Sequence, residues 1–164
     1  MRERRRLPFR ALLALALLVA GCNLPRDPED SLNRIRRTGV LRAGFTVHEP
    51  WVRLEGDTAA GPEADVVKAF AASLGARVEW RHGSESQLFE ALEKFEVDVA
   101  IGGFEQTNPW APKLGTTRPY VEVGSKKHIV ALPPGENRLL VEFERALRAR
   151  APAVAAFVGG TPVS

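Results

Sequence analysis

The sequence predicts an α/β fold, a single lobe in which a mostly parallel sheet of about four to five strands carries helices on both faces. The first observation is the order of patterns between residues 40 and 101, which runs strand, helix, strand, helix, strand. The second is the shortness of the connections, which favours right-handed crossovers. The third is composition: the 164 residues are 45% hydrophobic and contain no internal repeat, so one domain with its own core is expected.

A short helix and a strand are expected first. Asp27-Pro28 is typical of a helix start, because Pro suits the first helical position, and Gly39 is typical of a helix end. Residues 40–45 then have the composition of a strand. A long loop is expected over residues 46–61.

Two helices and two further strands follow. Apolar residues at 3.6-residue spacing predict a helix over residues 63–74, and alternation predicts a half-buried strand over residues 77–81. Ser84 and Gln87 form a capping-box pattern that begins the second helix. The apolar run 97–101 predicts a buried strand, which two glycines end.

The last third of the chain contains two strand candidates and one helix. The strands are expected over residues 120–123 and 128–132, and an amphipathic helix over residues 139–147. Everything after Ala151 is expected to form a loosely held tail.

The N-terminus has the pattern of a secretory signal. Five arginines precede an uninterrupted apolar run over residues 11–20, which is too short to span a bilayer as a helix. Val19-Ala20-Gly21-Cys22 resembles a bacterial lipobox, in which the cysteine is acylated, for example by palmitate, and becomes the first residue. The alternative is a soluble export signal with a free cysteine. The expected divisions are signal 1–21, tether 22–30, lobe 31–150 and tail 151–164.

Charge excludes one class of partner. Cleavage before Cys22, the only cysteine, would remove five Arg and one Glu and leave 18 basic and 19 acidic residues, a net charge of −1. No basic patch remains for phosphates, so nucleic acid is not an expected partner. Acyl chains on Cys22 would instead anchor the protein to a membrane, in the periplasm or on the outer cell surface. Asn23 after the cysteine favours the outer membrane in a Gram-negative cell.

Five segments, in order, resemble the family 3 extracellular solute-binding proteins of ABC transporters. They are TGVLRAG, HEPW, GPEADVV, the run from LFEAL to VDVAI, and TRPY, at residues 38–44, 48–51, 61–67, 88–101 and 117–120. The resemblance implies a periplasmic-binding-protein fold of type II, which has two lobes, and a small-molecule solute, usually an amino acid. It also implies a membrane transporter or another envelope protein as partner.

Two departures from the family pattern change what is expected. After Tyr120 the family chain builds a second lobe, whereas here the segment resembling the closing strand follows almost at once, so only one lobe is expected. In amino-acid binders a "Thr-x-x-Arg" loop supplies an Arg that holds the ligand carboxylate. Counting from Thr107, that position is Trp110, so the ligand is expected to be a solute other than an ordinary α-amino acid.

Seven residues are candidate ligand contacts because they fall at the expected carboxyl ends of the strands: Trp51, Gly102, Gly103, Phe104, Thr107, Trp110 and Arg118. Each has an alternative role. Trp51 either stacks on a ligand or anchors its loop to the core, and Trp110 either contacts a ligand or covers the sheet end. The glycines either allow close approach to their N–H groups or form a tight turn. Thr107 is equally suited to a local cap.

No cofactor or metal is expected. His48, His82 and His128 are widely spaced, and no cysteine of the lobe joins them. Glu49 and Glu105 are the acids in positions where a general acid would be needed, but no acid–base pair is evident.

The leading hypothesis is therefore a lipid-anchored, single-lobe solute-binding protein with no enzymatic activity. The second is an envelope module, or a sensor lobe without a transport role, that contacts another protein through its strand ends and aromatic residues. An enzyme is the third, because the resembled family includes dehydratases and is fused to lytic transglycosylases in other proteins.

Overall fold

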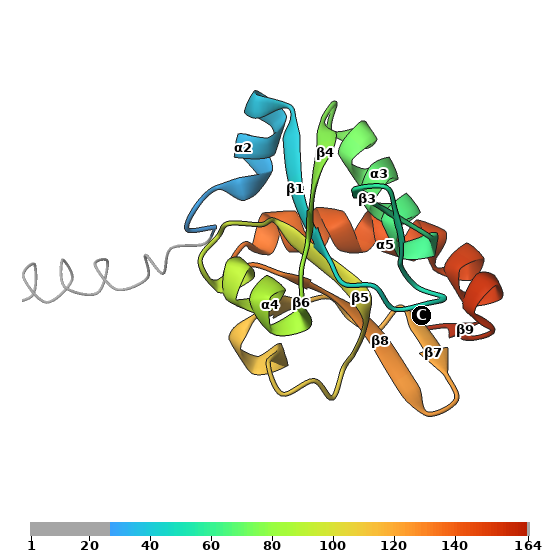
Figure 1. Ribbon diagram of the computed structural model, residues 1–164. Helices are drawn as coiled ribbons and strands as arrows, with labels where there is room; N and C mark the ends of the chain where they lie inside the picture. The colour runs from blue at the N-terminus through green and yellow to red at the C-terminus, as the bar shows by residue number, and fades with distance from the viewer. Residues whose placement is uncertain (1–26, 164) are drawn as a thin grey trace, which may run out of the picture.

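The computed structural model describes residues 27–163; the expected signal, Cys22 and residues 22–26 of the tether lie outside the described residues. A seven-stranded sheet has the order β4-β1-β5-β8-β7-β9, and β6 pairs with β8 (Figure 1). Within residues 27–163 no helix is long and apolar enough to cross a membrane. The strands of this sheet are β1 Val40–Phe45, β4 Arg77–His82, β5 Val99–Glu105, β6 Gly115–Thr116, β7 Val121–Val123, β8 Lys126–Leu132 and β9 Thr161–Pro162.

The α/β class is confirmed, but the sheet is mixed rather than mostly parallel. Strand β1 lies parallel to both β4 and β5, whereas β8 is antiparallel to β5, β6 and β7. Val123 pairs with Lys126, so only Gly124 and Ser125 connect β7 to β8. A two-residue connection can join only antiparallel strands. The predicted direct passage from Tyr120 into the closing strand is therefore present, as a hairpin.

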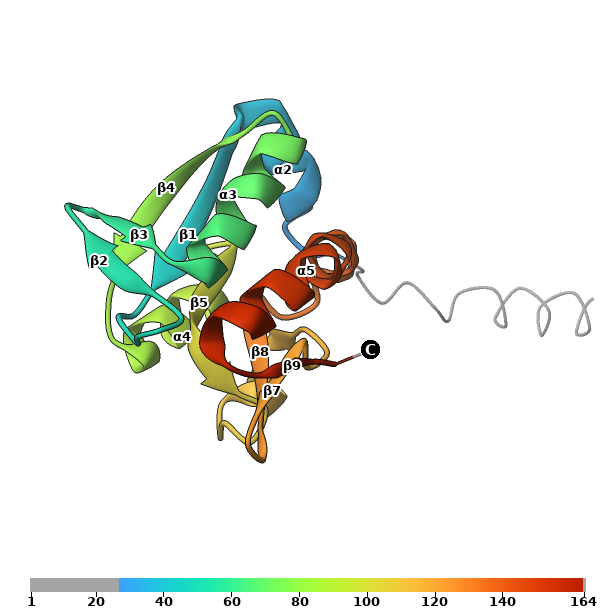
Figure 2. The same cartoon turned by 90° about the vertical axis from the view of Figure 1, so that its right-hand side faces the viewer.

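Helices cover both faces of the sheet, as predicted (Figure 2). Helices α2 (Ser31–Thr38), α3 (Pro62–Ser73) and α5 (Asn137–Val158) pack on one face around Phe45, Phe70 and Phe143. Helix α4 (Glu85–Glu93) packs on the other face, where Leu88, Phe89 and Leu92 meet Phe104 and Ile129. Side chains alternate along β5 between these two clusters, which is the period of a strand.

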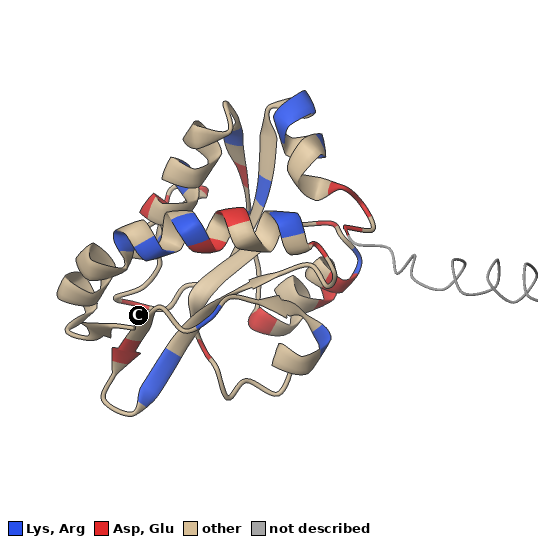
Figure 3. Cartoon of the chain, turned by 180° about the vertical axis from the view of Figure 1, so that it is seen from behind, with Lys and Arg blue, Asp and Glu red and all other residues tan. Residues whose placement is uncertain are grey.

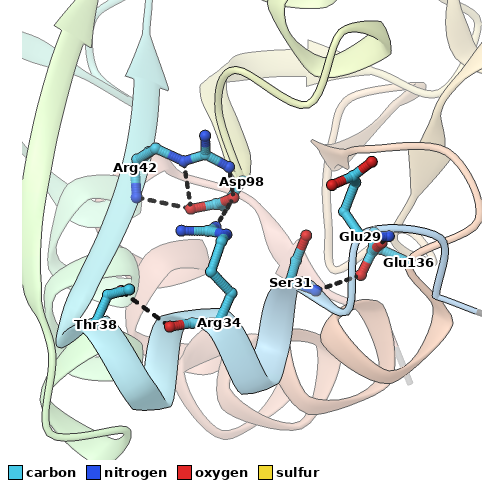
Figure 4. Close-up of polar contacts among 7 residues, drawn as sticks. All are labelled: Glu29, Ser31, Arg34, Thr38, Arg42, Asp98 and Glu136. Carbon is cyan, nitrogen blue, oxygen red and sulfur yellow. Dashed lines mark hydrogen bonds and ion pairs between the residues drawn. The ribbon is translucent and has the colours of Figure 1, made fainter.

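Local signals place several boundaries correctly. Ser84 accepts from the Gln87 N–H and the Gln87 side chain accepts from the Ser84 N–H, so the predicted capping box begins α4. Helix α2 ends at Gly39, whose φ of 66° suits glycine. Its start differs from the prediction, because its cap is distant in sequence: the buried Glu136 carboxylate accepts from the N–H groups of Glu29 and Ser31 at 2.7 and 2.9 Å (Figure 4).

Three segments contain more structure than their sequence predicts. The expected loop 46–61 includes a hairpin, in which β2 (Arg53–Glu55) is exposed and β3 (Thr58–Ala60) is mostly buried. Strand β5 continues through both glycines to Glu105. Helix α5 continues past Pro152 to Val158, and β9 then pairs with β7. The expected loose tail is thus packed, because Ala151, Val154 and Ala155 extend the buried stripe of α5.

The outer side of α5 carries both acidic and basic residues, with basic residues on either side of an acidic stretch (Figure 3). Glu142, Glu144, Arg145 and Arg148 contribute to this mixture. Interspersed charge of both signs is typical of a solvated helix face.

Candidate functional site

A hollow of about 300 Å³ lies where β5 ends, beside the start of α4 and the loop that follows β1. The carboxyl ends of parallel strands β1, β4 and β5 meet at this end of the sheet, where α/β proteins commonly bind ligands (Figure 1). Its lining is mainly polar: His48, Glu85, Gly102, Gly103, Phe104, Glu105, Thr107, Asn108 and Pro109.

Gly102 and Gly103 form the floor of the hollow, and their N–H groups are already occupied. The buried carboxylate of Glu63 accepts both, at 2.8 and 3.0 Å, and also accepts the Tyr120 hydroxyl. Burial raises the pKa of Glu63 above its ordinary value, although these three hydrogen bonds act in the opposite direction. The two glycines therefore do not offer free N–H groups to a ligand in this conformation.

The carbonyls of the same glycines contact two histidines. Nδ1 of His48 lies 2.8 Å from the Gly102 oxygen, and Nδ1 of His128 lies 3.0 Å from the Gly103 oxygen. Because a carbonyl only accepts, each Nδ1 carries the donated proton. Burial lowers the pKa of His128, whose Nε2 has no partner among the described residues. The backbone at Gly102–Gly103 is thus held on several sides.

Two of the aromatic candidates are buried: Trp51 lies outside the lining of the hollow, whereas Phe104 contributes to the lining while it packs into the core. Trp51 is 4% exposed and stacks on His128 with ring centroids 4.0 Å apart. Phe104 is 2% exposed and packs edge-on against Phe89 at 4.8 Å. Trp51 therefore anchors its loop to the core. A glycine is required at position 103 beside it, because a Cβ there would lie 2.5 Å from the indole.

Thr107, Asn108 and Pro109 form the outer wall of the hollow, and Trp110, a predicted ligand contact, lies outside its lining. Asn108 caps the local turn by accepting the Trp110 N–H at 2.9 Å, and its amide donates to Glu85 at 2.7 Å. Trp110 is partly buried against the α4 cluster and lies under the Lys113 ammonium, 4.9 Å from the ring centroid. Thr107 is exposed between this hollow and a neighbouring one that Lys126 helps to line.

Arg118 is not part of this group. It is exposed beside α5, where its N–H donates to Glu144 at 2.7 Å and its side chain lines a separate small hollow with Leu147 and Arg148. The structure therefore does not place Arg118 where it could replace the missing carboxylate-binding arginine.

Carboxylates dominate the charge of the hollow. Glu85 and Glu105 line it, and neither Lys nor Arg does. Lys126 hydrogen-bonds Glu105 at 2.6 Å and lowers the pKa of that carboxyl, which is the opposite of what a general acid requires. In the described part of the chain no group of three or more His, Cys, Asp or Glu residues could hold a metal ion.

Two larger hollows lie between helices. One of about 550 Å³ runs between α2 and the start of α5, and one of about 440 Å³ lies beside Phe157 at the end of α5. Neither includes the carboxyl ends of β1 and β5. The strand-end hollow is therefore the better candidate site, although it is smaller.

Sequence reasoning missed three contributors to this site. Glu63 lies 39 residues from Gly102, and Glu85 was not singled out. His128 was considered only as part of a strand and as a histidine too far from the others to bind metal. No local pattern marks such long-range partners. The position of Glu63 within the family-like GPEADVV segment was the one available signal.

Comparison with known proteins gives a family match. Residues 41–149 match the model of the bacterial extracellular solute-binding proteins, family 3. Membrane-bound lytic murein transglycosylase F of Vibrio cholerae is 37% identical over 108 residues, which cover 62% of this chain and 20% of that protein. The same-named protein of Vibrio vulnificus is 28% identical over 142 residues, covering 84% and 27%. The chain thus spans about a fifth to a quarter of the curated relatives it matches.

Solved structures show the same fold. The arginine-bound form of domain 1 from TmArgBP superposes with a TM-score of 0.64 at 21% identity, covering 71% of this chain and 97% of that one. The ancestral amino acid-binding protein AncCDT-1 gives a TM-score of 0.68 at 14% identity, covering 78% and 98%. These likenesses concern the fold.

Proposed function

The chain belongs to the bacterial extracellular solute-binding proteins, family 3, and we propose that it is an extracytoplasmic lobe that binds a small solute bearing a cationic group. The observation that carries this proposal is the lining of the strand-end hollow, which contains Glu85 and Glu105 but neither Lys nor Arg. A guanidinium or ammonium group there would find two carboxylates and the Thr107 hydroxyl within one hollow.

The position at which amino-acid binders carry the carboxylate-binding arginine is Trp110 in this chain, which supports the same ligand class. Without a carboxylate clamp, a solute would be held through its cationic end rather than through an α-carboxylate. The arginine-bound neighbour is itself a single domain, which supports binding by one lobe without a second. A one-sided hollow buries less of a ligand than a closed cleft does, so the expected dissociation constant is on the order of 1 mM.

The lobe itself has a binding role and no catalytic one in this proposal. Two acids support it: Glu105, in the lining of the hollow, is ion-paired, and Glu63, buried behind the glycine floor, is fully engaged by three donors. Incubation of the purified lobe with murein tests this part. Release of soluble fragments that is lost in Glu105→Gln would contradict it.

Titration of the ¹⁵N-labelled protein with L-arginine, L-lysine and putrescine, followed by NMR, tests the ligand class. We expect saturable shifts at Thr107 and Asn108, with no response to L-glutamate. Glu105→Gln and Glu85→Gln should each weaken binding about two- to fivefold, as for partly exposed charges. Glu90→Gln is the matched control, because Glu90 makes an equally short exposed pair with Lys94 on the outer side of α4. Saturation by none of the three cations would exclude the proposal.

A second candidate function is favoured by the curated relatives, which are named membrane-bound lytic murein transglycosylases. In it the lobe is an envelope module that contacts murein or a murein-processing enzyme and does not deliver a solute to a transporter. Co-sedimentation with purified sacculi tests it. Sedimentation that Glu85→Gln and Glu105→Gln leave unchanged would place that contact outside the hollow.

Lipid anchoring through Cys22 belongs to the same proposal and rests on the lipobox-like sequence. It would keep either kind of module at a membrane surface.

A further inference from the structure

Glu63 is a buried carboxylate that does not line the hollow, yet it joins two segments at the candidate site. Its side chain comes from the first turn of α3 and is 1% exposed. One carboxylate oxygen accepts the N–H groups of Gly102 and Gly103, and the other accepts the hydroxyl of Tyr120. The end of β5 and the segment that leads into β7 are therefore tied together at one side chain.

Glu63 stabilises a backbone conformation at Gly102–Gly103 that we expect to rearrange when its carboxylate is removed. Gly103 has a φ of 63°, and the pairing of β5 with β8 shifts register between Ala100 and Phe104. At this irregularity the N–H groups of both glycines point away from the ladder and toward α3, where Glu63 accepts them. Without an acceptor, two buried donors would be unpaired and the local backbone would rearrange to find partners.

We propose that Glu63 is a positioning residue for the strand-end hollow: it touches no solute, but it fixes the Gly102–Gly103 backbone that forms the floor. This inference rests on the proposed function, since it assigns how the shape of that same site is maintained. The position of the Thr107 and Asn108 wall depends on the floor as well, because the chain passes directly from Gly103 into that wall.

Substitutions of Glu63 can distinguish the effect of its hydrogen-bond geometry from the effect of its charge. In Glu63→Gln the amide oxygen can accept both glycine N–H groups, and the amide NH₂ can donate to the Tyr120 hydroxyl, which then acts as acceptor. Gln therefore preserves all three hydrogen bonds, whereas Ala removes them. A positioning role therefore predicts that Glu63→Gln retains the structure of the glycine floor and the binding of ligand, whereas Glu63→Ala loses both.

The test compares Glu63→Ala, Glu63→Gln and Asp98→Asn in two measurements. Asp98 is the matched control, because it is a buried carboxylate that accepts several donors at a distance from the hollow. In amide hydrogen exchange, Glu63→Ala should speed exchange at Gly102 and Gly103 at least about tenfold relative to other β5 amides, while Gln and the control leave this ratio unchanged. In titrations with L-arginine, Glu63→Ala should raise the dissociation constant about tenfold or more, and Gln less than about threefold.

Equal damage by Gln and Ala, or an exchange ratio that Ala leaves unchanged, would overturn the positioning role. Failure of the wild-type protein to bind L-arginine bears on the proposed ligand class alone, because hydrogen exchange at the two glycines still decides the role of Glu63. If Glu63→Ala does not fold, Tyr120→Phe replaces it, since it removes one of the three donors. Selective acceleration at Gly102 and Gly103 then supports the inference, and uniform acceleration along β5 contradicts it.

Discussion

Replacing Asp98 with Ala removes the acceptor that joins helix α2 to strand β1, and we expect a large loss of stability. The carboxylate is fully buried and accepts the Arg42 N–H at 2.9 Å and the Arg42 guanidinium at 2.6 and 3.2 Å. It also pairs with the guanidinium of Arg34 (Figure 4). Truncation would leave two guanidinium groups facing each other without the anion between them.

The size of the effect follows from the burial of the three partners. Removing one member of a buried ion pair costs about 3–5 kcal/mol, because the remaining charge is uncompensated. Arg34 and Arg42 are 24% and 31% exposed, so water can hydrate them in part. We therefore expect the lower end of that range, about 3 kcal/mol. For a domain of this size the midpoint of thermal unfolding should fall by about 10 °C.

Urea unfolding of the wild type and Asp98→Ala, followed by circular dichroism at pH 7, measures this difference. Glu79→Ala is the control, because Glu79 makes an exposed pair with Arg77 at 2.7 Å and should lose less than about 1 kcal/mol. A loss for Asp98→Ala below about 1 kcal/mol, or no larger than that of the control, would refute the argument. It would mean that the two arginines hydrate freely once the carboxylate is gone.

Three further predictions concern the glycine floor, the buried acid and the N-terminus. Gly103→Ala should lower the free energy of unfolding by about 3 kcal/mol, because of the positive φ and the overlap with Trp51. Gly124→Ala is the control: it has a φ of 62° and no atom within 4 Å, and it should lose about 1 kcal/mol. Equal losses in urea unfolding would show that Trp51 moves to make room for the added methyl group. Because burial raises the folded-state pKa of Glu63, its contribution to stability is full at low pH and is lost as pH rises through that pKa. Glu63→Gln should therefore gain stability relative to the wild type as the pH rises above 4.5, and a pH-independent difference would contradict this. Cys22→Ser should move the protein from the membrane fraction to the soluble fraction and abolish labelling by palmitate; unchanged fractionation would argue against lipid anchoring.

Elements with a clear local period could be predicted from the sequence. The expected strand over residues 40–45 coincides with β1, and the apolar stripe over residues 63–74 coincides with α3 within one residue. The capping box of α4 was likewise recognisable at Ser84. In each case the signal lies within one turn or one strand, so neighbouring residues suffice to specify it.

Elements stabilised by distant partners were not predictable in the same way. Strands β2 and β3 have no period that separates them from a loop, because β2 is wholly exposed. The segment after Ala151 was expected to be a loose tail, yet it continues α5 through the exposed Pro152, and the buried residues Ala151, Val154 and Ala155 hold the helix against the core. Here tertiary packing outweighs a poor local propensity.

The sequence by itself determined the α/β class, the family and the end of the lobe at which a ligand site is expected, because patterning and motif order are local properties of the chain. Only the tertiary structure decided which candidates meet there. It placed Trp51 in the core, Arg118 beside α5 and Glu63 beneath Gly102 and Gly103. Burial and hydrogen bonding between residues tens of positions apart depend on how the strands pair, and no short segment specifies that pairing.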